Sequence, residues 1–179
     1  MKTAMCVAAA TLSLTAAREG PMGLSLTSTA FTAGAAIPVK HTCDGADVSP
    51  PLAWSGAPPA TAAFALIADD PDAPAGTWVH WVLYDIAPTL SAIPENVVKV
   101  ETLKELGGAA QGKNDFRRLG YGGPCPPPGK PHRYFFKLYA LNALLGLSPG
   151  ATKTNVERAM DGRVLATAQL MGTFARQRR

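Results

Sequence analysis

The stretch AAFALIADDPDAPAGTWVHWVLYDI, residues 62–86, decides the fold class. Residues 62–68 form a continuous apolar run between turn residues, and this run is too short for a typical helix. Trp78–Ile86 is apolar at odd and even positions alike, so an extended chain here is apolar on both faces. Strands of this kind are covered on both sides. The stretch therefore predicts two strands buried inside a layered β structure and joined by an acidic loop.

Strand and helix signals along the rest of the chain agree with this interpretation. Three more segments have strand character: residues 24–27, 133–141 and 164–174. One helix is expected late in the chain, where Thr154 and Glu157 form a capping box and Gly162 ends the helical segment. The sequence predicts a mainly β protein, an antiparallel β-sandwich with one or two short peripheral helices, built as a single domain over residues 21–176.

The composition is typical of a globular, loop-rich chain. Of the 179 residues, 47% are hydrophobic and only 17% are charged, and there are 17 glycines and 16 prolines. The first 98 residues carry 3 basic and 8 acidic groups, and the remaining residues carry 14 and 5. The two halves of a compact domain neutralise each other in part, and no basic run is interleaved with aromatic residues. We therefore expect no nucleic-acid partner.

The first seventeen residues have the shape of a secretory signal peptide. Lys2 precedes an apolar stretch at residues 3–14, and small residues follow at 15–17, where a signal peptidase would cut. This stretch is too short to span a bilayer, and no other segment predicts a transmembrane helix. Cleavage would remove one of the three cysteines, Cys6, and leave an even number, as an oxidising compartment favours. We expect a periplasmic or secreted protein; the alternative is a cytoplasmic protein with an N-terminal extension.

Two loops are candidates for a functional site. The first holds Asp69, Asp70 and Asp72 between the two buried strands. The second is the stretch 107–132, which has almost no periodic pattern, and loops of this length in compact domains are usually functional or disordered. Its glycines would allow backbone N–H groups to approach a ligand closely.

Two of the three histidines lie beside these loops. Strand periodicity places Trp78 and His80 on one face of their strand, and likewise His132 and Tyr134 on theirs. An imidazole beside a carboxylate becomes a good hydrogen-bond donor to an anion. The alternative for each histidine is a hydrogen-bonded residue of the core.

A set of motifs occurs along the chain in a fixed order. They are CDG at residues 43–45, SPPL at 49–52 with Trp54, DDPDAP at 69–74, GTWVHW at 76–81, QGKNDF at 111–116, GYGGPCPPPG at 120–129 and HRYFFKLYAL at 132–141. In this combination the sequence resembles the phosphatidylethanolamine-binding protein family, in its bacterial and archaeal Raf-kinase-inhibitor-like branch, over roughly residues 23–175.

The resemblance implies a β-sandwich of the phosphatidylethanolamine-binding type, with a small pocket at one end. Such a pocket binds phosphate-like anions, phosphorylated small molecules or phospholipid headgroups without catalysis, cofactor or metal. The residues expected to form it are Asp70, Asp72, Trp78, His80, Gly122, Gly123, Pro124, His132 and Tyr134. We expect Asp70 to hold His80 or His132 as imidazolium, or to accept the proton of a monoprotonated phosphate. Amides of the glycine loop and the Tyr134 hydroxyl would add neutral donors.

The resemblance also places Cys43 and Cys125 in loops at the pocket end. A disulfide between them would close a loop of about 80 residues, and we expect this bridge together with export. In a cytoplasmic protein the alternative is two thiols packed side by side.

Other functions remain as alternatives to anion binding. Two histidines and one carboxylate form a metal-dependent active site in some enzymes. A hydrolase is a further alternative, although the sequence has no Gly-x-Ser-x-Gly nucleophile elbow. Finally, the resemblance implies a role in inhibiting a kinase or protease partner, which is compatible with a ligand pocket.

Overall fold

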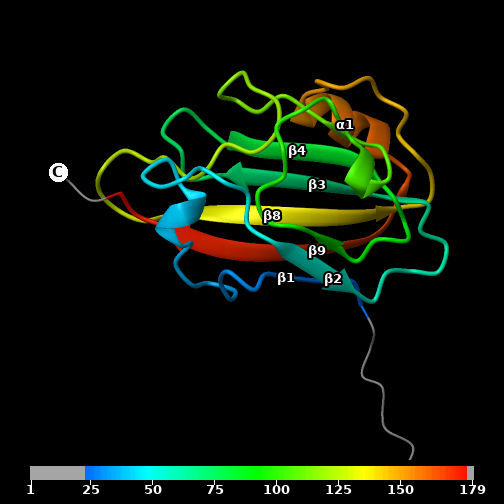
Figure 1. Ribbon diagram of the computed structural model, residues 1–179, viewed down its shortest axis with the longest axis horizontal. Helices are drawn as coiled ribbons and strands as arrows, with labels where there is room; N and C mark the ends of the chain where they lie inside the picture. Colours follow the sequence, from blue (N-terminus) through cyan, green and yellow to red (C-terminus); the bar gives the residue numbers. More distant parts are fainter. Residues whose placement is uncertain (1–22, 177–179) are drawn as a thin grey trace, which may run out of the picture.

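Two antiparallel sheets form the body of the protein in the computed structural model, which describes residues 23–176 (Figure 1). The larger sheet has six strands in the order β6-β7-β4-β3-β8-β9, and the smaller has three in the order β1-β2-β5. Four long strands dominate the larger sheet: β3 (Ala63–Asp70), β4 (Trp78–Ile86), β8 (His132–Leu141) and β9 (Val164–Phe174). The short strands are β1 (Ser25–Thr27), β2 (Leu52–Ser55), β5 (Ala92–Ile93), β6 (Thr102–Leu103) and β7 (Ala109–Gln111). The antiparallel β-sandwich predicted from the sequence is confirmed.

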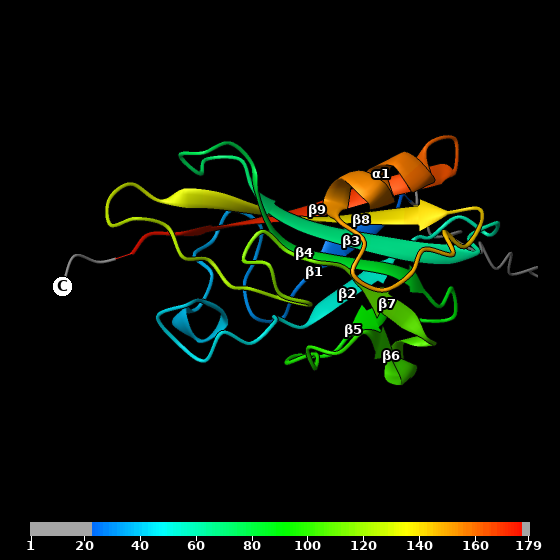
Figure 2. The ribbon, with the colours of Figure 1, turned by 90° about the horizontal axis from the view of Figure 1, so that it is seen from above.

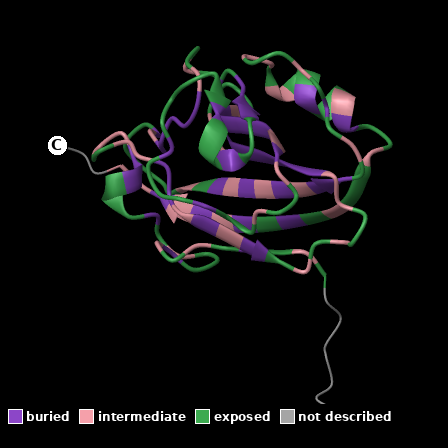
Figure 3. Cartoon of the chain, turned by 45° about the vertical axis from the view of Figure 1, so that its right-hand side comes forward, coloured by how far each residue is buried: buried purple, intermediate pink, exposed green. Residues whose placement is uncertain are grey.

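The larger sheet is covered on both faces. On one face Leu66 and Trp81 belong to the core that the larger sheet shares with the smaller sheet. On the other face Ile67 packs in a second core with Val156 of α1 (Lys153–Met160). Figure 2 shows α1 on one side of β3 and β8, with β1, β2 and β5 on the other side. Every residue of β3 is consequently buried, which is why residues 62–68 form an unbroken apolar run (Figure 3).

The single α-helix of the described residues begins earlier than the sequence predicted. Its N-cap is Thr152, whose Oγ1 accepts a hydrogen bond from the Asn155 N–H at 3.3 Å. In return, the Asn155 Oδ1 accepts the Thr152 N–H at 3.1 Å. The predicted capping box of Thr154 and Glu157 is therefore wrong. The sequence TKTNVE contains the same spacing twice, and the asparagine supplies the reciprocal acceptor in the first copy. Gly162 follows the helix with a φ of 69°, the left-handed conformation that suits a helix end.

The stretch 107–132, expected as one long loop, contains β7 and is fixed to its surroundings. Gln111 is fully buried at the end of β7, and its Oε1 accepts a hydrogen bond from Trp81 Nε1 at 3.1 Å. Its Nε2 donates to the carbonyl oxygens of Val98 and Val100, each at 2.7 Å. One buried amide thus joins the beginning of this stretch to β4 and to the segment before β6.

Three connecting segments meet at one end of the larger sheet, at the end where the C-terminus lies in Figure 1. They are the loop between β3 and β4, the loop before β8, and the segment that contains the 3-10 helix η1 (Val39–His41). A second 3-10 helix, η2 (Lys104–Leu106), lies between β6 and β7. Within residues 23–176, no helix combines the length and apolar character needed to cross a bilayer. The expected signal peptide at residues 1–17 lies outside the described residues.

Candidate functional site

A cavity of about 240 Å³ lies where these segments meet. Apart from its two histidines its wall is mostly apolar, and it is lined by Ala73, Pro74, Ala75, Trp78, His80, Phe116, Cys125, Pro126, Pro127 and His132. The structure thus brings together three residues that the sequence singled out, Trp78, His80 and His132, from β4 and β8. Ligand pockets for drug-sized molecules usually have 300–1,000 Å³, so this cavity suits a smaller ligand.

The three carboxylates of the acidic loop have three different partners. Asp69 binds Lys137 Nζ at 2.9 Å and Lys153 Nζ at 2.6 Å, beside α1 and on the far side of the sheet from the smaller sheet. Asp70 binds His132 at the cavity. Asp72 accepts two bonds from the Arg133 guanidinium and one from its backbone N–H, and these hydrogen bonds lower the pKa of Asp72 to about 2. Asp72 therefore fixes the loop to the start of β8 and does not line the cavity.

Asp70 is committed to His132. This carboxylate is only 3% exposed, and its Oδ2 lies 2.8 Å from the Nδ1 of His132. Its Oδ1 accepts the backbone N–H of Asp72 at 2.8 Å. Of the two histidines the sequence allowed, His132 is thus the partner. Both oxygens of Asp70 accept hydrogen bonds from the protein, and Asp70 is not among the residues that line the cavity, so the expectation that it accepts a ligand's proton stays a prediction.

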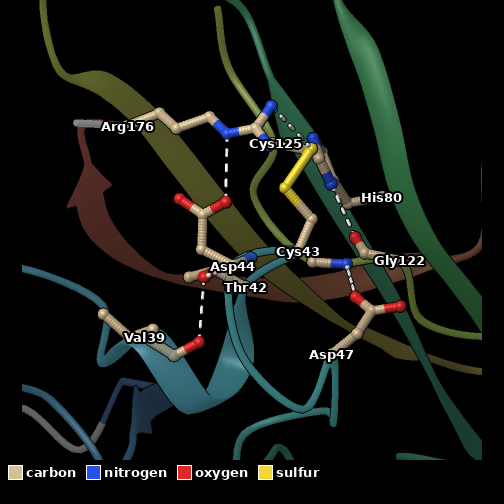
Figure 4. Close-up of a disulfide and its surroundings, with 10 residues drawn as sticks. Val39, Thr42, Cys43, Asp44, Asp47, His80, Gly122, Cys125 and Arg176 are labelled. Carbon is tan, nitrogen blue, oxygen red and sulfur yellow. Dashed lines mark hydrogen bonds and ion pairs between the residues drawn. A yellow bond between two sulfur atoms is a disulfide. The ribbon is translucent and has the colours of Figure 1, made fainter. Parts of the chain in front are cut away.

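His80 has a different environment from His132. Its Nδ1 lies 2.6 Å from the carbonyl oxygen of Gly122 (Figure 4). Its ring packs edge-to-face against Phe116 and Tyr134. Burial lowers the pKa of His80, although the Gly122 carbonyl and the charge of Asp70 act in the opposite direction. The lowered pKa favours the neutral imidazole of His80, and of the two histidines that the sequence allowed it is not the one that Asp70 holds.

The glycine loop contributes shape to the site and not free amides. The Gly122 N–H donates to the His80 carbonyl at 2.9 Å, and the Gly123 N–H donates to Asp47 Oδ1 at 2.6 Å. The expectation that these two amides bind a ligand is therefore wrong. Both positions need glycine for close packing: a Cβ on Gly122 would lie 2.6 Å from the Phe116 ring, and one on Gly123 would lie 2.5 Å from a backbone oxygen. The Pro124 carbonyl accepts the Cys43 N–H at 3.1 Å and so is also turned away from a ligand.

A disulfide joins Cys43 to Cys125 in the wall of the cavity (Figure 4). The two Cα atoms are 5.4 Å apart and the two residues are 82 positions apart in the chain. The predicted bridge is confirmed in the structure. Next to the disulfide, the Arg176 Nε donates to Asp44 Oδ1 at 3.0 Å. This bond holds the residues that follow β9 against the segment that contains Cys43. The covalent bond thus fixes the proline-rich cavity wall to the segment that follows η1.

Two buried donors at the site have no hydrogen-bond partner among the described residues. They are the indole Nε1 of Trp78, which lines the cavity, and the hydroxyl of Tyr134, whose ring contacts His80. Burial, and next the charge of Asp70, raise the pKa of the Tyr134 phenol well above its usual range, so it keeps its proton. Buried polar groups in proteins are nearly always satisfied, so an unpartnered donor at a cavity calls for a ligand or water.

Sequence reasoning missed three residues of the site. Phe116 packs edge-to-face against Trp78 as well as His80, at centroid separations of 5.4 Å. Asp115 Oδ2 accepts the backbone N–H of Val79 at 2.7 Å and fixes that loop to β4. Asp47, which holds Gly123, comes from a segment 76 residues away. The motif QGKNDF at residues 111–116 and the length of the loop at residues 107–132 signalled the first two, without assigning either residue to the site.

The alternative of a metal-dependent active site finds no donor set in the part of the chain that the structure describes. Within residues 23–176, no three His, Cys, Asp or Glu side chains lie close enough together to hold a metal ion. The carboxylate that would complete a site of two histidines and one carboxylate, Asp70, is already paired with His132.

Comparison with known proteins gives a consistent result. The sequence model of the phosphatidylethanolamine-binding protein family matches residues 27–175. A UPF0098 protein of Methanothermobacter thermautotrophicus is 48% identical over 153 residues, which are 86% of this chain and 99% of that protein. A UPF0098 protein of Aquifex aeolicus is 50% identical over 151 residues, 83% of this chain and 86% of the other.

Two solved structures have the same fold. One is CT736 of Chlamydia trachomatis, described as a phosphatidylethanolamine-binding protein homologue, with a TM-score of 0.79 and 39% identity. The match covers 87% of this chain and 99% of CT736. The other is E. coli YBCL, described as a member of the mammalian family, with a TM-score of 0.80 and 33% identity over 86% of this chain and 99% of YBCL.

Proposed function

Because the chain belongs to the phosphatidylethanolamine-binding protein family, we propose that it binds phosphate-like anions in the cavity beside His80 and His132. The ligands would be phosphorylated small molecules or phospholipid headgroups, and binding would involve no chemical turnover. One observation carries the proposal: the imidazoles of His80 and His132 line one cavity together with Trp78, and the buried Nε1 of Trp78 has no hydrogen-bond partner among residues 23–176. An indole N–H can only donate, so its partner must be an acceptor such as a phosphate oxygen.

The absence of a usable nucleophile among the lining residues supports binding without catalysis. Of the residues that line the cavity, Cys125 is the one with a nucleophilic atom other than imidazole nitrogen, and its sulfur is bonded to Cys43. The disulfide also supports the proposal that the protein works in an oxidising compartment, outside the cytoplasm. A kinase or protease partner stays a prediction from the family resemblance.

The proposal is tested by calorimetric titration with O-phosphorylethanolamine and inorganic phosphate. The Trp78→Phe variant keeps an aromatic ring and deletes the N–H, and we expect it to weaken binding by about tenfold or more, as for a hydrogen bond to a charged group. The matched control is Trp54→Phe, because Trp54 Nε1 is also buried and unpartnered but belongs to the core between the sheets. Equal affinities in both variants, or no binding by the unmodified protein at millimolar ligand, would overturn the proposal.

A further inference from the structure

The hydrogen-bonding groups of the cavity that have no partner in the protein indicate which kind of phosphate ester fits. His80 provides the key group. The carbonyl oxygen of Gly122 can only accept, so the Nδ1 of His80, 2.6 Å away, carries the ring proton. A neutral ring with its proton on Nδ1 has a lone pair on Nε2. In Figure 4 the second nitrogen of His80 lies at the far end of the ring from Gly122. His80 therefore offers a ligand an acceptor and not a donor.

The surroundings of His80 keep the ring in this neutral state. Its faces pack against Phe116 and Tyr134, and it is 4% exposed. Two carboxylates, Asp70 and Asp115, lie close enough for their charges to favour the imidazolium, but the effect of burial on the pKa is larger than both. Each of these carboxylates also has its own partner: His132 for Asp70, and the Val79 N–H for Asp115.

The other unsatisfied groups at the site are donors. Trp78 Nε1, in the cavity wall, can only donate. The Tyr134 phenol also keeps its proton, but it lies behind the wall, beside Asp70, and is not among the lining residues. Asp70 is not among the lining residues, and its oxygens accept hydrogen bonds from His132 and from the Asp72 N–H. The second imidazole of the wall, that of His132, is held by Asp70 through its Nδ1. A matching ligand needs negatively charged oxygens for the donors and one O–H group for His80.

A monoprotonated phosphomonoester has this pattern, because it keeps one P–OH group besides its two charged oxygens. A phosphodiester has no P–OH group. Its unprotonated oxygens would face the lone pair of His80, and with no proton between the two acceptors neither would be satisfied by the other. We propose that this cavity selects phosphomonoesters over phosphodiesters, with the Nε2 of His80 accepting the hydrogen bond of the remaining P–OH. The inference rests on the proposed function and narrows it to free phosphorylated molecules, as opposed to the phosphodiester of an intact phospholipid.

Two pairs of ligands test the selectivity at equal charge. At pH 5.5, below the second pKa of a phosphomonoester near 6, methyl phosphate and dimethyl phosphate each carry about one negative charge and differ in the P–OH group. O-phosphorylethanolamine and glycerophosphoethanolamine form the second pair, which compares a free phosphorylated headgroup with the diester of a lipid. We expect calorimetry to show at least about tenfold tighter binding of the monoester in each pair.

The outcomes separate the inference from the proposed function. Equal affinities within both pairs would overturn the selectivity and leave anion binding intact. No binding of any of the four ligands would overturn both. The unmodified protein alone gives this answer, so it does not depend on whether a variant folds.

A variant then assigns the selectivity to His80. The amide of His80→Gln can rotate to present either its oxygen or its NH₂ group, so the preference should fall below about threefold. The matched control is His41→Gln, since His41 is also buried, has its Nδ1 2.9 Å from the Val48 carbonyl, and lies outside the cavity. This control should keep the full preference. A preference unchanged in His80→Gln would overturn the role of His80.

Discussion

The Nδ1 of His132 and the Oδ2 of Asp70 lie 2.8 Å apart, and this hydrogen bond joins two neighbouring strands, β8 and β3, at the edge of the cavity. The Asp70 side chain is 4% exposed and that of His132 is 12% exposed, so the pair is well shielded from solvent. Its hydrogen bond fixes both the tautomer and the orientation of the imidazole. The first prediction concerns this pair.

Replacing Asp70 by Asn should weaken phosphate binding by about tenfold or more, because His132 loses its charged partner. We also expect the free energy of unfolding to fall by about 1–3 kcal/mol, as for a lost buried hydrogen bond to a charged group. Calorimetry and urea denaturation measure the two effects. The matched control is Asp85→Asn, at the far end of β4, where the carboxylate accepts the N–H groups of Leu145 and Gly146. If Asp85→Asn and Asp70→Asn bind phosphate equally well, the Asp70–His132 pair has no part in binding.

Replacing Tyr134 by Phe should separate stability from binding. Within residues 23–176 the buried hydroxyl has no partner at hydrogen-bond distance, so its removal should leave the unliganded protein as stable as before, or more stable by about 1 kcal/mol. Affinity for methyl phosphate should fall by about three- to tenfold, because a donor is lost. Thermal denaturation without ligand and calorimetry with ligand provide the measurements. A clear loss of stability with unchanged affinity would mean that the hydroxyl has a structural partner.

The depressed pKa of His80 predicts a pH dependence of stability. Below the unfolded-state pKa of about 6.5, the unfolded chain binds a proton at His80 that the folded protein does not. Stability is therefore complete above this pH and falls as the pH drops from 6.5 towards the folded-state pKa, with a slope of at most about 1.4 kcal/mol per pH unit from this residue. Urea denaturation between pH 5 and 7.5 should show a smaller slope in His80→Gln than in the unmodified protein. Identical slopes would show that His80 titrates normally.

Removing the disulfide should affect both stability and the cavity. For a closed loop of this length the chain-entropy model gives about 4–5 kcal/mol, an upper figure because measured values are often smaller. The Cys43→Ser and Cys125→Ser double variant should have a lower free energy of unfolding, by up to about this amount. It should also bind phosphate more weakly, because the proline-rich wall of the cavity is no longer fixed.

Thiol counting checks the bridge directly. In denaturant without reductant, the full-length chain should contain one reactive thiol, that of Cys6, and a chain that has lost residues 1–17 should contain none. Intact mass identifies which form is present. Two thiols in the shortened chain, or three in the full chain, would contradict the oxidised state.

The strands of the larger sheet were predictable because burial on two sides leaves a direct trace in the sequence. The apolar stretches around Leu66, in Trp78–Ile86 and in Val164–Phe174 became strands close to the predicted ranges. Trp78, His80 and His132 could likewise be connected to one cavity, since each lies at a strand end beside a conspicuous loop.

The details of the site could not be predicted, because they depend on partners far away in the chain. The amide of Gly123 looked free for a ligand, yet Asp47 accepts its hydrogen bond from 76 residues away. The sequence around Phe116 has no hydrophobic periodicity that would place this side chain in the wall of the cavity. β3 pairs with β4, which carries His80, and also with β8, which carries His132, so no local pattern shows which histidine is the partner of Asp70.

The opposite orientations of Asp69 and Asp70 have a consequence for how this protein tolerates insertions and deletions. Side chains alternate between the two faces of a strand, so a shift by one residue exchanges the faces of all the residues that follow. One residue added or lost in β3 would turn Asp69 towards the cavity and Asp70 towards the lysines. The contact of Asp69 with Lys153 of α1 and the contact of Asp70 with His132 would then be lost together. Substitutions in this strand can be compensated one at a time, whereas a length change moves both carboxylates at once, so we expect length changes to be tolerated in the loops and not at this end of β3.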